Sequence, residues 1–294
     1  MAVLMAEVNI SEGKNMALVE EVKNALLAGD PVDLIDLNSN EDHNRTVFTY
    51  KGEPRAVLEG TKRLAAKAVE LIDMTKHHGS HPRMGAVDVV PFIPVKDITI
   101  EETIVLAKEF GSFLGGLGVP VYYYEDAATR EDRKALPKLR KGEYEGLKDR
   151  MADPEDIDYG PDEGPSTFNA KSGATVTGVR FPLVAFNVNL KMNDIEIGKK
   201  IVKAVRAATG GYQHVRAIAL PLEERGLIQV SMNLTNYEKT PIHRVFETIK
   251  SEASQYGVLI EDTELVGPLP VYALESVLKF YLQAHSFNME QLYS

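Results

Sequence analysis

The order of short apolar runs and amphipathic stretches constrains this 294-residue chain more than any other feature. In the first third, β-rich runs and helical periodicity alternate as strand, helix, strand, strand, helix, strand, which is the split-βαβ or ferredoxin-like order. We expect strands at Val3–Asn9, Val32–Leu37, Thr46–Tyr50 and Ala86–Val95, and helices at Asn15–Ala28 and from Pro54 to Met74. A capping-box spacing from Thr99 to Glu102 predicts a further helix, and Pro120–Glu125 a further strand.

The last third repeats this order without repeating the residues. We expect strands at Phe181–Leu190, Val215–Leu222, Leu227–Leu234 and Val258–Ile260, a helix from a cap at Asn193 or Asp194 to Ala208, a helix with Thr240 as N-cap and Pro241 at its first position, and a last helix at Val271–Gln283. The predicted fold class is α/β of the α+β type. Two ferredoxin-like βαββαβ subdomains, residues 1–179 and 180–294, would flank a central ligand-binding groove.

Between the repeats, Met151 to Gly178 has no clear periodicity and contains several glycines and prolines. A stretch of this length without secondary structure is typical of a binding loop or a linker.

Composition excludes several classes of chemistry. The chain has no cysteine, so disulfides, thiolate zinc sites, iron–sulfur clusters and cysteine nucleophiles are absent. Its formal net charge of −10 argues against a nucleic-acid partner. It has no apolar stretch long enough for a membrane span and no signal-peptide pattern, so we expect no membrane association and a cytoplasmic location.

The densest group of chemically useful residues runs from Lys76 to Gly85 and contains three of the seven histidines, His77, His78 and His81. An imidazole both takes and gives a proton near neutral pH, so one reading is acid/base catalysis. A metal site formed by the three histidines is a second reading. The third is a polar helix terminus in which the histidines interact with the helix dipole.

Two other motifs stand out. In Asp42–Thr46, Arg45 could grip a carboxylate with its planar guanidinium, or the segment is a turn in which Asn44 satisfies neighbouring backbone groups. Gly164–Gly173 combines glycines, which let a backbone approach a ligand closely, with the ring of Phe168 and several hydroxyls. The alternative is a mobile linker. The glycine-rich stretch Gly111–Gly118 indicates helix termination and tight packing, because it follows a helix rather than a strand.

Several segments together resemble the formiminotransferase family. They are Val8–Asn15, His43–Val47, His81–Asp88, Pro91–Val95, Gly164–Ser166, Gly173–Thr175 and Ala185–Leu190, in the family's order over nearly the whole chain. The octapeptide that starts at His81 is the most specific of them. The chain ends where a formiminotransferase domain would, so we expect no cyclodeaminase domain.

The resemblance implies glutamate formimidoyltransferase activity, in which the formimino group of N-formimino-L-glutamate passes to N5 of tetrahydrofolate during histidine degradation. It implies two α/β subdomains around a folate-binding groove, His81 as the catalytic histidine, and a folate-binding segment of Gly164, Pro165, Ser166, Thr167, Phe168, Asn169, Ala170, Lys171, Ser172 and Gly173. This chain has Asn38 where some members carry Asp. If that carboxylate orients the imidazole, Asp36 or Asp42 would have to substitute.

On chemical grounds we expect His81 to shuttle the proton from the attacking nitrogen to the leaving nitrogen without a metal. We expect Arg45 and Arg83 to hold substrate carboxylates, with Asn38 beside them. The substrates are anionic, so Lys14, Arg45, Arg83, Lys171 and Arg180 should converge on the groove. Rival readings are an enzyme that processes 5-formyltetrahydrofolate and a folate-binding protein without catalysis. An exposed edge strand in each sheet would allow a homodimer.

Overall fold

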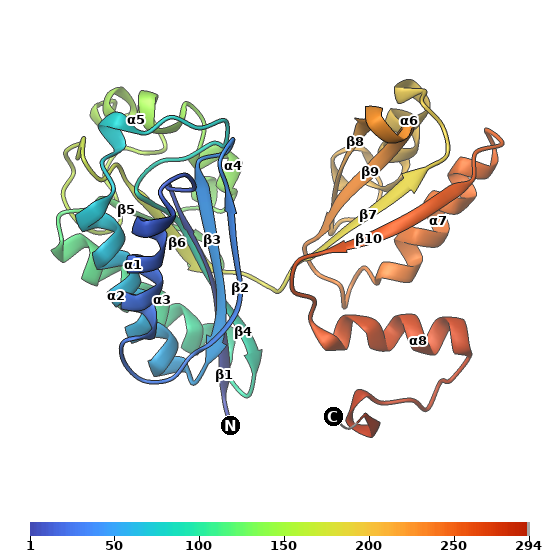
Figure 1. Cartoon of the computed structure of the whole chain (residues 1–294), viewed down its shortest axis with the longest axis horizontal. Coiled ribbons are helices and arrows are strands. Elements are labelled where there is room, and N and C mark those ends of the chain that lie inside the picture. Colours follow the sequence, from blue (N-terminus) through green and yellow to red (C-terminus); the bar gives the residue numbers. More distant parts are fainter. Residues whose placement is uncertain (293–294) are drawn as a thin grey trace. The chain divides into compact units, whose positions relative to one another are not determined.

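The computed structural model describes residues 1–292 and divides the chain into two compact units, unit 1 (Met1–Arg180) and unit 2 (Phe181–Ser294). Each unit has its own sheet, six-stranded in unit 1 and four-stranded in unit 2 (Figure 1). Each also has its own core of buried aliphatic and aromatic side chains. The predicted α/β fold with two subdomains is therefore confirmed.

Unit 1 contains the first βαββαβ repeat and an extension of it. Its strands are β1 (Val3–Ile10), β2 (Asp33–Asn40), β3 (Arg45–Gly52), β4 (Val87–Lys96), β5 (Val121–Glu125) and β6 (Thr175–Val179). Its α-helices are α1 (Met16–Leu27), α2 (Pro54–Leu71), α3 (Ile100–Gly116), α4 (Leu136–Leu139) and α5 (Glu143–Ala152). The sheet order β2-β3-β1-β4 is the ferredoxin-like order, and β6 and β5 continue it beyond β4.

Helices lie on both faces of this sheet. Figure 1 shows α1, α2 and α3 side by side along one face, where Leu58, Phe92 and Phe110 belong to the main core. The shorter α4 and α5 cover the other face only over β4, β6 and β5, where Leu139 and Leu147 pack with Tyr122 and Tyr124. Over β2, β3 and β1, no helix of unit 1 contributes to a buried cluster on that second face within residues 1–180.

The segment Met151–Gly178 corrects a prediction, because its end forms β6. This strand lies between β4 and β5 and is parallel to both. All five of its residues are buried, so the alternation of apolar and polar residues that reveals a one-sided strand is missing. Gly178 is required there because a Cβ would lie 2.3 Å from the Tyr124 carbonyl oxygen. The segment belongs wholly to unit 1 and is not a linker between the units.

Unit 2 has the ferredoxin-like order β10-β7-β9-β8. Its strands are β7 (Val184–Leu190), β8 (Val215–Leu222), β9 (Leu227–Leu234) and β10 (Ile260–Val266). Its α-helices are α6 (Ile195–Val205), α7 (Ile242–Ser254) and α8 (Glu275–Leu282). Asp194 caps α6 by accepting from the backbone of Glu196 and Ile197, as one of the two predicted caps.

Several predicted boundaries were wrong; for example, α6 ends at Val205 rather than Ala208, and α8 begins at Glu275 rather than Val271. The closing strand runs over Ile260–Val266 rather than Val258–Ile260, because β10 is an edge strand whose charged side chains face solvent. Pro241 occupies the N-cap position of α7, so Thr240 is not the cap. Helix α2 ends at Leu71 and a short 3₁₀ turn, Met74–Lys76, follows it. The capping box at Thr99 is as predicted, and α3 ends at Gly116 within the predicted glycine-rich terminus, with Gly111 packed against Tyr123.

Candidate active site

Two loops of unit 1 that are far apart in sequence are joined at the predicted site. One connects β2 to β3 and contains Asp42, and the other connects α2 to β4 and contains Ser80. The Ser80 backbone N–H and its hydroxyl both donate to the Asp42 carbonyl oxygen, each at 3.0 Å. A Cβ at Gly79 would lie 2.2 Å from the His43 carbonyl oxygen, so only glycine permits this approach.

Asn44 fixes both loops to the end of β1. It is buried, and its backbone has a φ of +48°, in the left-handed region that asparagine tolerates better than most residues. Its Oδ1 accepts from the Gly13 N–H at 3.0 Å, and its Nδ2 donates to the His78 carbonyl oxygen at 3.0 Å. The predicted turn is present, since the Asn44 N–H donates to the Glu41 carbonyl oxygen at 3.1 Å, but the Asn44 side chain bonds to distant segments rather than to neighbouring backbone groups.

His81 faces Arg45 across these joined loops. The His81 Nε2 and the Arg45 Nη1 lie 2.6 Å apart. Because a guanidinium only donates, His81 Nε2 is the acceptor and the imidazole is neutral, with its proton on Nδ1. The ring of His43 lies beside it, at 5.7 Å between ring centroids. His81 is half-buried, so it is accessible to a ligand while its base strength is set by the protein.

Burial and positive charge both disfavour the imidazolium form. Desolvation is the largest cause that lowers the pKa of His81, followed by the charges of Arg45 and Arg140 and the proximity of His43, and the result is a pKa of about 3. Burial lowers the pKa of Arg45 as well, and the nearby charge of Arg140 adds to that effect. His81 is therefore neutral throughout the physiological pH range.

The second cation near His81 is held by a buried carboxylate. Arg140, just after α4, forms an ion pair with Asp88 of β4. Asp88 is 1% exposed and also accepts from the Met84 backbone N–H at 2.8 Å. Asp88, the last residue of the octapeptide that starts at His81, is thus buried and orients Arg140.

Arg83 lies in the interior rather than on an open surface. It is 6% exposed and forms ion pairs with Glu143 and Glu145 of α5. Its Nε donates to His77 Nδ1 at 3.3 Å, and His77 Nε2 donates to the Asn44 carbonyl oxygen at 2.8 Å. His77 therefore orients the loop and does not interact with the end of α2. The binding of a substrate carboxylate by Arg83 stays a prediction.

The predicted folate-binding segment is tied to unit 1 at both ends. Gly164 has a φ of +81°, and a Cβ there would lie 2.3 Å from the Val119 carbonyl oxygen. Gly173 pairs with Gly85 in an isolated antiparallel bridge, next to hydrogen bonds from Ala174 N to Met84 O (3.1 Å) and from Ala86 N to Ser172 O (2.8 Å). These glycines approach protein backbone, and the alternative of a mobile linker is not supported.

The middle of the segment exposes Ser166 and Thr167, whereas Phe168 is half-buried. The Phe168 ring lies 5.5 Å from that of Tyr144 in α5, whose hydroxyl donates to the Ala170 carbonyl oxygen at 2.6 Å. Asn169 holds the turn, because its Oδ1 accepts from two backbone N–H groups that follow it. The structure thus connects this segment to the His81 loop through Gly85.

The cations expected to converge are largely engaged elsewhere. Lys171 Nζ donates to the Glu70 carbonyl oxygen at 2.8 Å, and Arg180 forms an ion pair with Glu7. Lys14 is exposed. Of the predicted set, Arg45 reaches His81, and Arg140 is the second cation there.

Asn38 is exposed on β2 and pairs in register with Val47, which places it on the same sheet face as Arg45. Asp36 lies one pleat further along the same face, opposite Thr49. Asp42 contacts the His81 loop only through its carbonyl oxygen among the hydrogen bonds of residues 1–292. His81 thus pairs with the Arg45 side chain, whereas a carboxylate from Asp36 or Asp42 was considered as its partner.

Two further findings bear on the alternatives. Within residues 1–292, no group of three or more histidine, aspartate or glutamate side chains is placed to hold a metal ion, and both ring nitrogens of His77 are engaged by Asn44 and Arg83. No helix in that same range is long and apolar enough to cross a bilayer. The predicted homodimer, cytoplasmic location and groove stay predictions.

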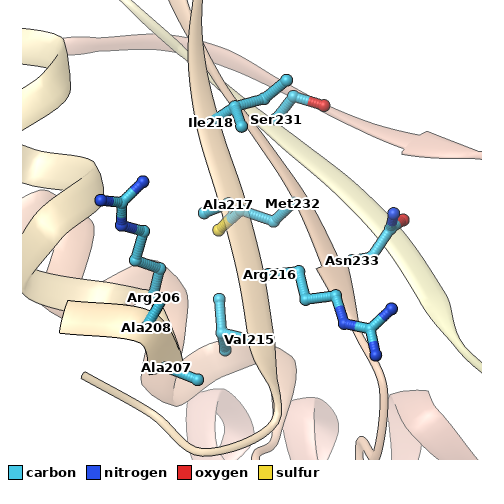
Figure 2. Close-up of a pocket in the computed structure, with 10 residues that line it drawn as sticks. All are labelled: Arg206, Ala207, Ala208, Val215, Arg216, Ala217, Ile218, Ser231, Met232 and Asn233. Carbon is cyan, nitrogen blue, oxygen red and sulfur yellow. The ribbon is translucent and has the colours of Figure 1, made fainter. Parts of the chain in front are cut away.

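A cavity of about 440 Å³ lies elsewhere, at the β8 edge of unit 2 (Figure 2). It is lined by β8, β9 and the turn after α6, and none of the predicted site residues takes part. Figure 2 shows Arg206 and Arg216 on opposite sides of the β8 ribbon, so the two guanidinium groups do not converge on one ligand position.

Sequence reasoning missed Arg140, Asp88 and Tyr144 as parts of the site. Asp88 was within the octapeptide, but its role depends on a partner 52 residues away. Arg140 stands among Lys138 and Lys141, a pattern typical of a solvated surface. No local signal distinguishes Arg140, the half-buried cation of this run that pairs with Asp88, from its exposed neighbours Lys138 and Lys141.

Comparison with known proteins covers nearly the whole chain. Residues 3–180 match the family model described as formiminotransferase domain, N-terminal subdomain, and residues 185–292 match the one described as formiminotransferase domain. A protein named glutamate formimidoyltransferase from Streptococcus pyogenes serotype M1 is 44% identical over 95% of this chain and 93% of its own length. One of the same name from Thermoplasma acidophilum is 41% identical over 95% and 92%. The formimidoyltransferase-cyclodeaminase of Sus scrofa is 41% identical over 96% of this chain, which spans 53% of that relative.

Proposed function

The chain belongs to the formiminotransferase family, and on that premise we propose that it is a glutamate formimidoyltransferase. The reaction would convert N-formimino-L-glutamate and tetrahydrofolate into L-glutamate and 5-formimidoyltetrahydrofolate. The observation that carries the assignment is the 44% identity to a glutamate formimidoyltransferase over 95% of the chain.

The chemistry requires two proton movements and no redox step. A bond forms between N5 of the reduced folate and the amidine carbon, and the bond from that carbon to the glutamate nitrogen breaks. The attacking nitrogen must lose a proton and the leaving nitrogen must gain one. In our proposal His81 takes the first proton and delivers the second, because a neutral imidazole can act as base and then as acid.

The Gly164–Gly173 segment is our candidate for folate binding. Bound tetrahydrofolate supplies the nucleophilic nitrogen. Ser166 and Thr167 present exposed hydroxyls, and the Phe168–Tyr144 ring pair offers an apolar edge next to them. The bridge between Gly173 and Gly85 would keep this segment close to the His81 loop, so that two substrates could be aligned with each other.

Arg45 is the better of the two predicted carboxylate ligands. Its guanidinium bonds to His81 and to no carboxylate among the ion pairs of residues 1–292, whereas Arg83 is already paired with two glutamates. Asn38 lies on the same sheet face as Arg45 and would add an amide donor there. Much of the rate would then come from orientation of the two substrates.

The test is the His81→Ala variant, with His78→Ala as a matched control because His78 is an exposed neighbour on the same loop. His81→Ala should lower kcat by at least about 10²-fold while tetrahydrofolate binding, measured by fluorescence quenching, persists. His78→Ala should leave kcat unchanged. Turnover of His81→Ala near that of the wild type would remove His81 from the mechanism. Parallel assays with N-formimino-L-glutamate and with 5-formyltetrahydrofolate would separate formimino transfer from formyl processing.

A further inference from the structure

Four buried nitrogen atoms around His81 have no hydrogen-bond partner among residues 1–292. They are His43 Nδ1, Arg45 Nε, His81 Nδ1 and Arg140 Nε. Buried polar groups are normally paired, so several unpaired nitrogens in one place need an explanation. Two of them belong to guanidinium groups, which donate only, and no carboxylate of the described part of the chain reaches these two atoms.

Positive charge also exceeds negative charge around His81. Among residues 1–292, the one carboxylate that acts on Arg45 and Arg140 is that of Asp88, which is already engaged by Arg140 and by the Met84 N–H. Arg140 is near enough to influence the pKa of both Arg45 and His81. An anion that accepts from both arginines would balance the charge and satisfy the orphaned donors together.

We propose that Arg45 and Arg140 together bind the α-carboxylate of formiminoglutamate, that Asp88 positions Arg140 for this contact, and that the bound carboxylate draws Arg45 away from His81. The inference rests on the proposed function and adds to it the identity of the second arginine and the way in which the base becomes available.

Geometry favours the α-carboxylate over the γ-carboxylate. In formiminoglutamate, the α-carboxylate carbon is two bonds from the nitrogen that leaves, whereas the γ-carboxylate is separated from it by the whole side chain. His81 must reach that nitrogen to protonate it, and Arg45 Nη1 is only 2.6 Å from His81 Nε2. A carboxylate held by Arg45 is therefore within about two hydrogen-bond lengths of the imidazole that delivers the proton.

The same contact explains how an imidazole with a strongly lowered pKa could act as a base. Nε2 is occupied by Arg45, and burial, followed by the charges of the two guanidinium groups, lowers the pKa of the ring. A carboxylate that pairs with both arginines offsets their charge and removes the competing donor. His81 would therefore become basic only when the glutamate derivative is bound.

The first experiment compares two unreactive ligands, N-formyl-L-glutamate and N-formyl-4-aminobutyrate, which differ only in the α-carboxylate. Calorimetry should show that the wild type prefers the first by at least about tenfold, and that Arg140→Gln loses most of this preference. Asp88→Asn should weaken the preference in the same direction. Arg140→Lys keeps a charge beside Asp88 and should retain part of it. Arg130→Gln, which changes an exposed arginine of the same unit, is the control and should behave as the wild type.

The second experiment follows the His81 ring by NMR on histidine-labelled protein. N-formyl-L-glutamate should raise the pH at which His81 titrates in the wild type and should not do so in Arg140→Gln. In steady-state assays, Arg140→Gln should raise KM for formiminoglutamate by about tenfold or more and leave KM for tetrahydrofolate within about twofold.

An unchanged ligand preference and an unchanged His81 titration in folded Arg140→Gln would overturn the proposal. If Arg140→Gln does not fold, a full wild-type preference for N-formyl-L-glutamate in Arg140→Lys would overturn the proposal. A preference for N-formyl-4-aminobutyrate in the wild type would mean that the γ-carboxylate binds there instead, and would also refute it. These binding readouts do not need turnover, so they distinguish failure of this inference from failure of the proposed formimino transfer.

Discussion

The bridge between Gly173 and Gly85 allows a quantitative test of how the two site segments are held together. Gly173 has a φ of +63°, and a Cβ added there would lie 2.1 Å from the Met84 carbonyl oxygen. Gly160 has a φ of +62°, and a Cβ there meets nothing within 4 Å. The variants Gly173→Ala and Gly160→Ala therefore share the same backbone strain and differ in the steric clash.

The expected magnitudes follow from these two terms. Placing alanine in the left-handed region costs about 1 kcal/mol at either position. At Gly173 the clash with backbone forces the bridge apart, which loses the Ala174–Met84 and Ala86–Ser172 hydrogen bonds at about 1 kcal/mol each. Gly173→Ala should thus lower the free energy of unfolding by about 3 kcal/mol, against about 1 kcal/mol for Gly160→Ala.

Thermal unfolding followed by far-UV circular dichroism measures this difference. For a unit the size of Met1–Arg180, about 1 kcal/mol corresponds to about 2–4 °C in Tm, so Gly173→Ala should unfold about 6–12 °C lower and Gly160→Ala about 2–4 °C lower. Equal shifts in the two variants would refute the reasoning, because they would mean that the bridge yields without loss. The kcat of Gly173→Ala should fall as well, since the folate-binding segment and the His81 loop would separate.

Three further outcomes are expected. The pKa of His81 is lowered to about 3 in the folded chain, so the unfolded chain binds more protons as the pH falls below about 6.5. The free energy of unfolding of the wild type should therefore fall over this pH range, and that of His81→Asn should fall less. Parallel curves of stability against pH would contradict this. Arg83→Gln should cost about 2 kcal/mol in urea titrations, because it leaves the buried His77 Nδ1 without its donor. Arg55→Gln, in an exposed ion pair with Glu109, should cost less than about 1 kcal/mol, and equal losses would argue against the buried contact. Dialysis against a chelator should leave formimino transfer unchanged, and metal analysis that finds one zinc per active chain together with loss of activity would disprove a metal-free mechanism.

The fold was predictable because its signals are local. Helical periodicity and turn residues lie within a few positions of one another, and both ferredoxin-like repeats follow from them. Strand β6 was missed because burial on both faces removes the alternation of apolar and polar residues. The prediction of the edge strand β10 ended too early, because its charged residues are not typical of a strand.

The site was predictable only in its parts. His81 and Arg45 each belong to a recognisable motif, but their contact at 2.6 Å depends on how two distant loops meet. The engagement of Arg83 by Glu143 and Glu145, and of Arg140 by Asp88, is likewise decided by tertiary packing. A single sequence does not distinguish a cation that binds substrate from one that holds an element in place.

Asn44 has a consequence for the engineering of this scaffold. Its side chain binds the backbone at Gly13 and at His78, and its carbonyl oxygen accepts from His77, so three chain segments share one residue as their common anchor. These segments form a single transplantable module. A chimera that exchanges the β2–β3 loop alone, without the His77–His81 loop and the turn at Gly13, should misplace the imidazole even where every catalytic side chain is retained.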